Sequence, residues 1–189
     1  MSFLPTDECK NYAPKNSTIK LIKNETSNTV IESKSPSTDQ PSTSSTNRPK
    51  LKYLPASLDD PVPNDWIAIE DNFVLLLVVY LPLIAPDFIA TPHSKFNDGC
   101  MHLLFIKEGV TKAQLLNLMT MFETGQHLNS PHIEYVKVKA FRLEPLSNEN
   151  AAQQREGVMM IDGERVPCAK VQAEIVPGLA NVLNRPNFQ

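Results

Sequence analysis

The feature that most limits the possible folds is an apolar run from Phe73 to Ala85, which Pro82 interrupts and Pro86 follows. The run is well short of the roughly 20 apolar residues that a membrane-spanning helix needs. Proline also removes a backbone donor and breaks the interior of a helix. Because β-branched and aromatic side chains are frequent in the run, its sequence favours a buried β-strand over a buried helix or a membrane anchor.

The segments after this run predict a mainly β fold, an antiparallel β-sandwich with one major amphipathic helix. Apolar alternation predicts a strand over residues 133–143, and its reversal near Ala140 and Phe141 predicts a bulge. His102, inside a predicted strand, is interpreted as a hydrogen-bonded sheet residue rather than a ligand. The predicted strands cover residues 73–81, 100–106, 133–143, 157–161, 164–166 and 170–176.

One segment carries the signals of a helix. Thr111 and Gln114 have the spacing of a capping box at the helix start, and Gly125 is suited to end the helix. The apolar residues fall on one face and are Leu115, Leu118, Met119 and Phe122.

The N-terminal third differs from the rest in composition. Residues 35–46 contain no apolar side chain other than proline, so burial cannot offset the entropy lost on ordering. We therefore expect residues 1–60 to be a disordered Ser/Thr/Pro-rich insert or tail, residues 61–184 to fold as one domain, and residues 185–189 to be a short tail.

Composition also narrows the partners and the compartment. A net charge of −3 gives no polyelectrolyte signature, so nucleic acid is not expected as a partner. Cys9, Cys100 and Cys168 are odd in number and lack the Cys/His spacing of a zinc site, which indicates reduced thiols. The first residues lack the basic-then-apolar order of a secretory signal, and we expect a cytoplasmic protein.

Asp162, Gly163 and Glu164 lie between two predicted strands. An Asp-Gly pair in this position favours a tight hairpin turn, because glycine adopts positive φ without penalty. The turn would hold two carboxylates side by side at the end of a sheet. On this evidence alone an ordinary solvated turn is the simpler interpretation.

The order of short segments resembles one family, the sphingosine kinases, and specifically their C-terminal, lipid-binding half. The most specific pair is Ala140–Pro145, which reads AFRLEP, followed by the DGE of residues 162–164. The other segments are 62–66 (VPNDW), 73–75 (FVL), 90–93 (ATPH), 99–103 (GCMHL) and 123–127 (ETGQH).

This resemblance implies a two-lobed lipid kinase of the diacylglycerol kinase superfamily that uses ATP and Mg²⁺ to phosphorylate sphingosine. By resemblance, Asp162, Gly163 and Glu164 would face the nucleotide phosphates, with Asp162 and Glu164 as metal ligands. Two carboxylates on a tight turn suit a hard divalent cation that retains waters.

The resemblance also implies an apolar channel for the lipid tail. The matching positions here are Ile84, Phe88, Met119, Phe122 and His127, of which Ile84 and Phe88 would form a mobile gate. From helical spacing alone, Met119 and Phe122 would be ordinary core residues, and His127 would be an exposed loop residue.

The chain also departs from the family pattern. It has neither the glycine-rich phosphate loop nor the Ser-Gly-Asp-Gly segment that carries the catalytic base in the N-terminal lobe, so no catalytic residue is assigned. We expect the chain alone to be inactive, with an N-terminal kinase lobe, sphingosine and related sphingoid bases, and a peripherally contacted membrane as partners. The alternative is a non-catalytic module that binds sphingoid bases or regulates a kinase.

Overall fold

The computed structural model describes residues 1–15, 21–22, 49, 51–146 and 157–181. In this part of the chain the helices are α1 (Lys112–Met121) and the 3₁₀ turns η1 (Asp7–Cys9) and η2 (Gln126–Asn129). The strands are β1 (Ser2–Pro5), β2 (Leu21–Ile22), β3 (Ile67–Ile69), β4 (Phe73–Val79), β5 (Leu83–Ala85), β6 (Phe88–Ile89), β7 (Met101–Lys107), β8 (Glu134–Leu143), β9 (Met159–Ile161), β10 (Glu164–Val166) and β11 (Val171–Glu174).

One large antiparallel sheet organises the molecule. Its strand order is β2-β3-β1-β8-β7-β4, and β11 also pairs with β8. The strands β5 and β6 form one separate hairpin and β9 and β10 form another. The prediction of a mainly β, antiparallel fold with one major helix is therefore confirmed.

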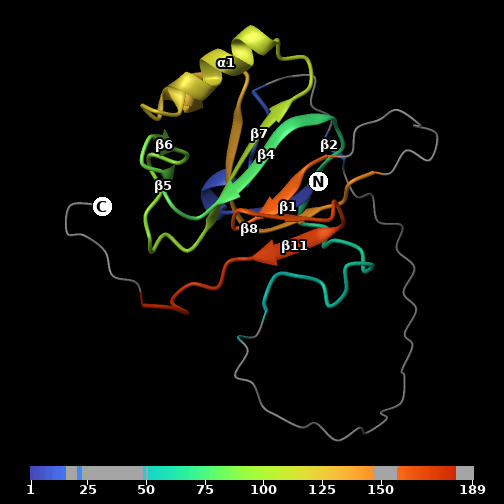
Figure 1. Cartoon of the computed structure of the whole chain (residues 1–189). Coiled ribbons are helices and arrows are strands. Elements are labelled where there is room, and N and C mark those ends of the chain that lie inside the picture. The colour runs from blue at the N-terminus through green and yellow to red at the C-terminus, as the bar shows by residue number, and fades with distance from the viewer. Residues whose placement is uncertain (16–20, 23–48, 50, 147–156, 182–189) are drawn as a thin grey trace, which may run out of the picture.

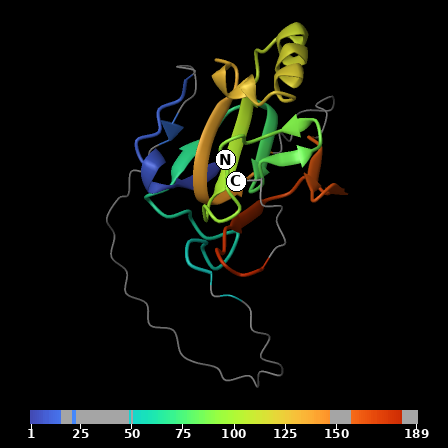
Figure 2. The same cartoon turned by 90° about the vertical axis from the view of Figure 1, so that its left-hand side faces the viewer.

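The central strand β7 is buried on both faces of the sheet. Leu103 and Phe105 belong to one core cluster, whereas Leu104 and Ile106 belong to a second cluster that also contains Leu118 of α1. Successive side chains of a strand point to opposite faces, so these clusters lie on the two sides of the sheet. Figures 1 and 2 both show α1 at one end of the large sheet, with the β5–β6 hairpin beside it.

Strand β8 contains the predicted bulge. Leu4 pairs with Ala140 and Pro5 with Val138, so the pairing with β1 skips Lys139. Val138 and Phe141 consequently contribute to the same core cluster, although they are an odd number of positions apart in the strand. The bulge lies one residue earlier than expected.

The N-terminus is part of the sheet. Strand β1 pairs with both β3 and β8, and Phe3 is fully buried. The expectation that all of residues 1–60 are disordered is therefore wrong for residues 2–5, because pairing with distant strands orders a segment too short to show a pattern of its own. The Ser/Thr/Pro-rich tract at residues 35–46 and the tail at 185–189 lie outside the described residues.

The helix begins as predicted. Thr111 is the N-cap, and a complete capping box joins it to Gln114, whose backbone amide donates to the Thr111 hydroxyl at 3.3 Å. Gly125 has a φ of 71° and directly precedes η2. Among the described residues, no helix has the length and apolar character that crossing a bilayer requires.

Candidate functional site

Three aromatic rings from separate elements stack at the end of α1. The Phe122 ring lies 4.4 Å from the Phe88 ring and 3.8 Å from the His127 imidazole, measured between centroids, with interplanar angles of 18° in both pairs. Phe122 and His127 are fully buried and Phe88 is half-buried. We call Phe88, Phe122 and His127 the aromatic cluster, which joins β6, the end of α1 and η2.

Backbone contacts fix this arrangement. The amide of Ile89 donates to the carbonyl of Phe122 at 2.9 Å, which holds β6 against the end of α1. At Gly125 an added Cβ would lie only 3.2 Å from the Pro92 side chain and 3.4 Å from that of Ile89. A glycine at this position therefore permits both the left-handed turn and the close approach of the two chain segments.

His127 has one engaged nitrogen. Nε2 lies 2.9 Å from the carbonyl oxygen of Ala90, and because a carbonyl only accepts, Nε2 carries the proton. Nδ1 is buried and makes no hydrogen bond of standard geometry. Burial lowers the pKa of His127, against the opposing effect of the Ala90 and Met121 carbonyls. The imidazole is consequently neutral near pH 7, with a buried lone pair on Nδ1.

The other two residues predicted for the lipid channel lie nearby in the fold. Met119 is half-buried and packs against the core cluster that contains Phe122. Ile84 lies on β5, in the same hairpin as Phe88, with 52% of its surface exposed. The structure thus brings Phe88, Met119 and Phe122 together with His127, while Ile84 stays at the surface. The prediction of an exposed His127 from the sequence alone is wrong, because the Phe122 ring and the Ala90 carbonyl cover it.

Two hollows are lined by other residues. One, of about 620 Å³, is lined by the ends of β1, β3, β4 and β8 and includes Glu70, Asp71 and Glu144. The other, of about 350 Å³, lies between α1 and the segment 129–132. None of the residues predicted to bind lipid or nucleotide lines either hollow. Of the predicted lipid residues, Phe88, Phe122 and His127 stack on one another in this conformation, and Met119 packs against the core cluster that contains Phe122.

The DGE segment forms the predicted hairpin. Glu164 pairs with Ile161, which leaves Asp162 and Gly163 as a two-residue loop with φ of 50° and 86°. Positive φ at both positions is the mark of a type I′ turn, for which Asp-Gly is a favoured pair. All three residues of the DGE segment are exposed.

The two carboxylates of this turn are available to bind a ligand. Within the described part of the chain, neither Asp162 nor Glu164 has a hydrogen-bond or ion-pair partner. Two unpartnered carboxylates suit Mg²⁺, which keeps several waters and takes few protein ligands. They fit as part of such a site, with phosphate oxygens and waters supplying the remaining ligands.

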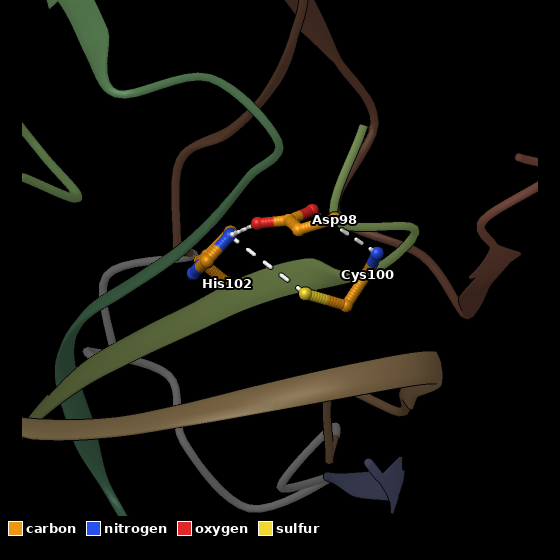
Figure 3. Close-up of side chains that lie close together, drawn as sticks. All are labelled: Asp98, Cys100 and His102. Carbon is orange, nitrogen blue, oxygen red and sulfur yellow. Dashed lines mark hydrogen bonds and ion pairs between the residues drawn. The ribbon is translucent and has the colours of Figure 1, made fainter. Parts of the chain in front are cut away.

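His102 is a hydrogen-bonded sheet residue, as the sequence predicted. It is fully buried, with Nδ1 2.7 Å from the Tyr135 hydroxyl and Nε2 2.9 Å from Asp98 Oδ2. Burial lowers the pKa of His102, which Asp98 opposes, and burial raises the pKa of the Cys100 thiol to about 11, with Asp98 adding to the shift. The sequence analysis missed that Asp98, Cys100 and His102 converge (Figure 3), although the spacing of Cys100 and His102 by two in a predicted strand places these two on one face.

Comparison with protein families gives one matching model. The model for the YegS C-terminal NAD kinase beta sandwich-like domain matches residues 87–184. The matched range contains the aromatic cluster, Met119 and the DGE turn, and it begins three residues after Ile84.

Curated relatives are also similar to this chain. Human sphingosine kinase 2 is 37% identical over 136 residues, which cover 71% of this chain and 20% of the relative. Sphingosine kinase B of Dictyostelium discoideum is 37% identical over 134 residues, covering 70% of this chain and 17% of the relative. Sphingosine kinase 1 of Mus musculus is 37% identical over 123 residues, which cover 64% of this chain and 30% of the relative. The chain therefore spans less than a third of the length of these relatives.

Proposed function

Because the chain belongs to the YegS C-terminal NAD kinase beta sandwich-like domain family, we propose that it is the C-terminal part of a sphingosine kinase. Such an enzyme transfers the γ-phosphoryl group of ATP to the primary hydroxyl of sphingosine. In this proposal the chain binds the lipid and contributes one edge of the nucleotide site. Similarity to several sphingosine kinases supports the substrate class.

The aromatic cluster is the observation that carries the lipid part of the proposal. It gathers three of the five proposed channel residues from β6, α1 and η2, and Met119 packs beside it. Moving an alkyl chain from water to such a surface is favourable by about 25 cal/mol for each Å² of apolar area that is buried. We propose that Phe88, Met119, Phe122 and His127 line the channel for the sphingoid tail.

Entry of the tail requires an opening, because these side chains fill the space between their elements. The β5–β6 hairpin is the proposed gate, since it is short, it carries the half-buried Phe88, and it exposes Ile84. Movement of the hairpin would separate the Phe88 ring from that of Phe122. Its exposed apolar residue, Ile84, is also the proposed contact with the membrane that holds the substrate, and the proposed location is the cytoplasm, with peripheral membrane association.

The DGE turn carries the nucleotide part of the proposal. Asp162 and Glu164 would hold Mg²⁺ at the ATP phosphates, and the ion would supply positive charge against the charge that develops during transfer. Gly163 shapes the turn that presents both carboxylates. The phosphate loop and the base for the attacking hydroxyl are assigned to an N-terminal kinase lobe, so the chain alone is expected to be inactive.

Binding of sphingosine to the chain tests the lipid part. We expect saturable binding of radiolabelled sphingosine in detergent micelles, displaced by unlabelled sphingosine. Phe88→Ala removes the ring at one end of the stack. An aromatic contact contributes about 1 kcal/mol in addition to the burial of apolar area, so the substitution should weaken binding about tenfold. Phe96→Ala is the matched control, because Phe96 is an exposed phenylalanine outside the cluster. Binding that does not saturate, or that both variants weaken equally, would contradict the proposal.

A further inference from the structure

A second group of side chains lies outside the proposed lipid and nucleotide sites. Asp98 and Cys100 precede β7, and His102 lies within it; one ligand atom from each lies within 4.8 Å of the other two. His102 Nε2 is 2.9 Å from Asp98 Oδ2 and 3.8 Å from Cys100 Sγ. Cys100 and His102 are buried, whereas Asp98 is partly accessible to solvent. Figure 3 shows the Asp98 carboxylate and the Cys100 thiol pointing toward the imidazole of His102.

The arrangement differs from a Cys-His-Asp relay. A relay uses the two nitrogens of the ring separately, one toward the nucleophile and one toward the carboxylate. Here both the thiol and the carboxylate face Nε2, and Nδ1 is engaged by the Tyr135 hydroxyl at 2.7 Å. One nitrogen carries at most one proton, which can serve only one of the two acceptors at a time. Three donor atoms around one point are the geometry of a metal site.

We infer that Asp98 Oδ2, Cys100 Sγ and His102 Nε2 form a binding site for a zinc-class divalent transition metal. Zinc lies about 2.3 Å from sulfur and about 2.0 Å from imidazole nitrogen, so tetrahedral ligands are about 3.5 Å apart. The separations of 2.9 and 3.8 Å from His102 Nε2 lie on either side of this value, and Asp98 and Cys100 have ligand atoms within 4.8 Å of each other. A set of three protein ligands leaves the fourth position for water or another small ligand.

The surroundings hold the ligands in place. Tyr135 fixes the outer nitrogen of His102, and its ring stacks on the imidazole at 5.8 Å between centroids. The amide of Cys100 donates to Asp98 Oδ1 at 3.3 Å. Gly99, with a φ of 62°, makes the turn between the two ligands, and a Cβ there would lie 3.3 Å from Pro177.

The charged groups in and near the site are compatible with a bound divalent cation. A thiolate and a carboxylate together neutralise a divalent cation. Two lysines lie close by, and each has its own acceptor: Lys137 pairs with Glu8 at 3.0 Å, and Lys139 donates to the Gly99 carbonyl at 2.7 Å.

Cobalt(II) provides the test, because a tetrahedral cobalt–thiolate site has a near-ultraviolet charge-transfer band that identifies the cysteine ligand. We expect the full 189-residue chain, after treatment with a chelator, to bind one Co²⁺ with this band, and Zn²⁺ to displace it. Cys100→Ser should abolish the band, and Asp98→Asn should weaken binding at least tenfold. Cys168→Ser is the matched control and should leave both unchanged, since Cys168 is exposed and lies outside the group.

Three results would overturn the inference. These are the absence of a charge-transfer band in the parent chain, a band that persists in Cys100→Ser, and a band that disappears in Cys168→Ser. Far-ultraviolet circular dichroism of each variant separates lost ligation from lost folding. If Cys100→Ser unfolds, Asp98→Asn decides the question, because Asp98 lies at the surface end of the group and unchanged Co²⁺ affinity in that variant would refute the site.

Discussion

The ring of Phe122 stacks on the imidazole of His127 with 3.8 Å between centroids, and both side chains are fully buried. The contact joins the last turn of α1 to the 3₁₀ turn that follows Gly125. It places a neutral imidazole with an unpartnered Nδ1 beside the proposed path of a lipid tail. If the lipid tail lies there as proposed, stability and lipid binding are linked at this contact.

The buried histidines predict how stability depends on pH. Burial is the main cause of the lowered pKa of His102 and His127, so the unfolded chain binds more protons than the folded chain near pH 6.5. The stabilisation is present above pH 6.5 and is lost as the pH falls. Urea unfolding should give a free energy of unfolding that decreases from about pH 7.5 to 5.5, where unperturbed histidine titrates.

Substitution separates the contribution of His127 from the rest. His127→Gln keeps a donor for the Ala90 carbonyl but does not titrate, so the slope with pH should become shallower. His93→Gln, at an exposed position, is the matched control and should keep the parent slope. An unchanged slope in His127→Gln would show that this imidazole does not contribute.

Asp162 and Glu164 should matter for activity and not for stability. Because both carboxylates are exposed and without partners among the described residues, Asp162→Asn and Glu164→Gln should change the free energy of unfolding by less than about 0.5 kcal/mol. Gly163→Ala should cost about 1 kcal/mol, because φ is 86° there. Urea unfolding measures the free energy of unfolding of all three variants. A loss above about 2 kcal/mol for Asp162→Asn would indicate a structural role.

Membrane contact by the β5–β6 hairpin predicts a specific loss of liposome binding. Ile84→Asp places a charge on the proposed contact surface and should reduce co-sedimentation with liposomes about tenfold or more, since burying a charge is costly. Leu179→Asp, at a leucine that is 65% exposed, is the control for an added charge elsewhere. Equal association of Ile84→Asp and the parent chain would remove this hairpin from the membrane contact.

Arg142 is predicted to hold the segment 57–60 on the sheet. It is buried, and its guanidinium donates to Gln172 Oε1 at 2.7 Å, to the Ser57 carbonyl at 3.0 Å and to the Asp60 carbonyl. A lysine cannot reproduce this fork of donors, so Arg142→Lys should lower the free energy of unfolding by about 2 kcal/mol. Arg165→Lys, at an exposed position, should be neutral in the same urea titration. Similar free energies of unfolding for the two variants would refute this role of Arg142.

Local sequence signals predicted most of the elements. The Thr111–Gln114 capping box, the Asp162–Gly163 turn and the alternation in β8 each act within a few residues, and the structure confirms all three. These signals depend on backbone geometry and on side-chain periodicity. They say little about which distant segments meet.

The features that the sequence did not predict depend on distant partners. Strand β1 exists because Phe3 is buried between β3 and β8, more than 60 residues away in the chain. His127 is buried because Phe122 and the Ala90 carbonyl close over it, a consequence of the turn at Gly125. The convergence of Asp98 and Cys100 on His102 depends on the Gly99 turn, which brings a loop residue back to the strand.

Phosphoryl transfer from radiolabelled ATP to sphingosine tests the central claim most directly. The chain is assayed alone and joined to the N-terminal lobe of human sphingosine kinase 2, a relative that is 37% identical. We predict no sphingosine 1-phosphate from the chain alone, product from the joined protein, and about 100-fold less product when Asp162→Asn and Glu164→Gln remove the carboxylates. Turnover by the chain alone, or full activity of the joined protein without these carboxylates, would contradict the account.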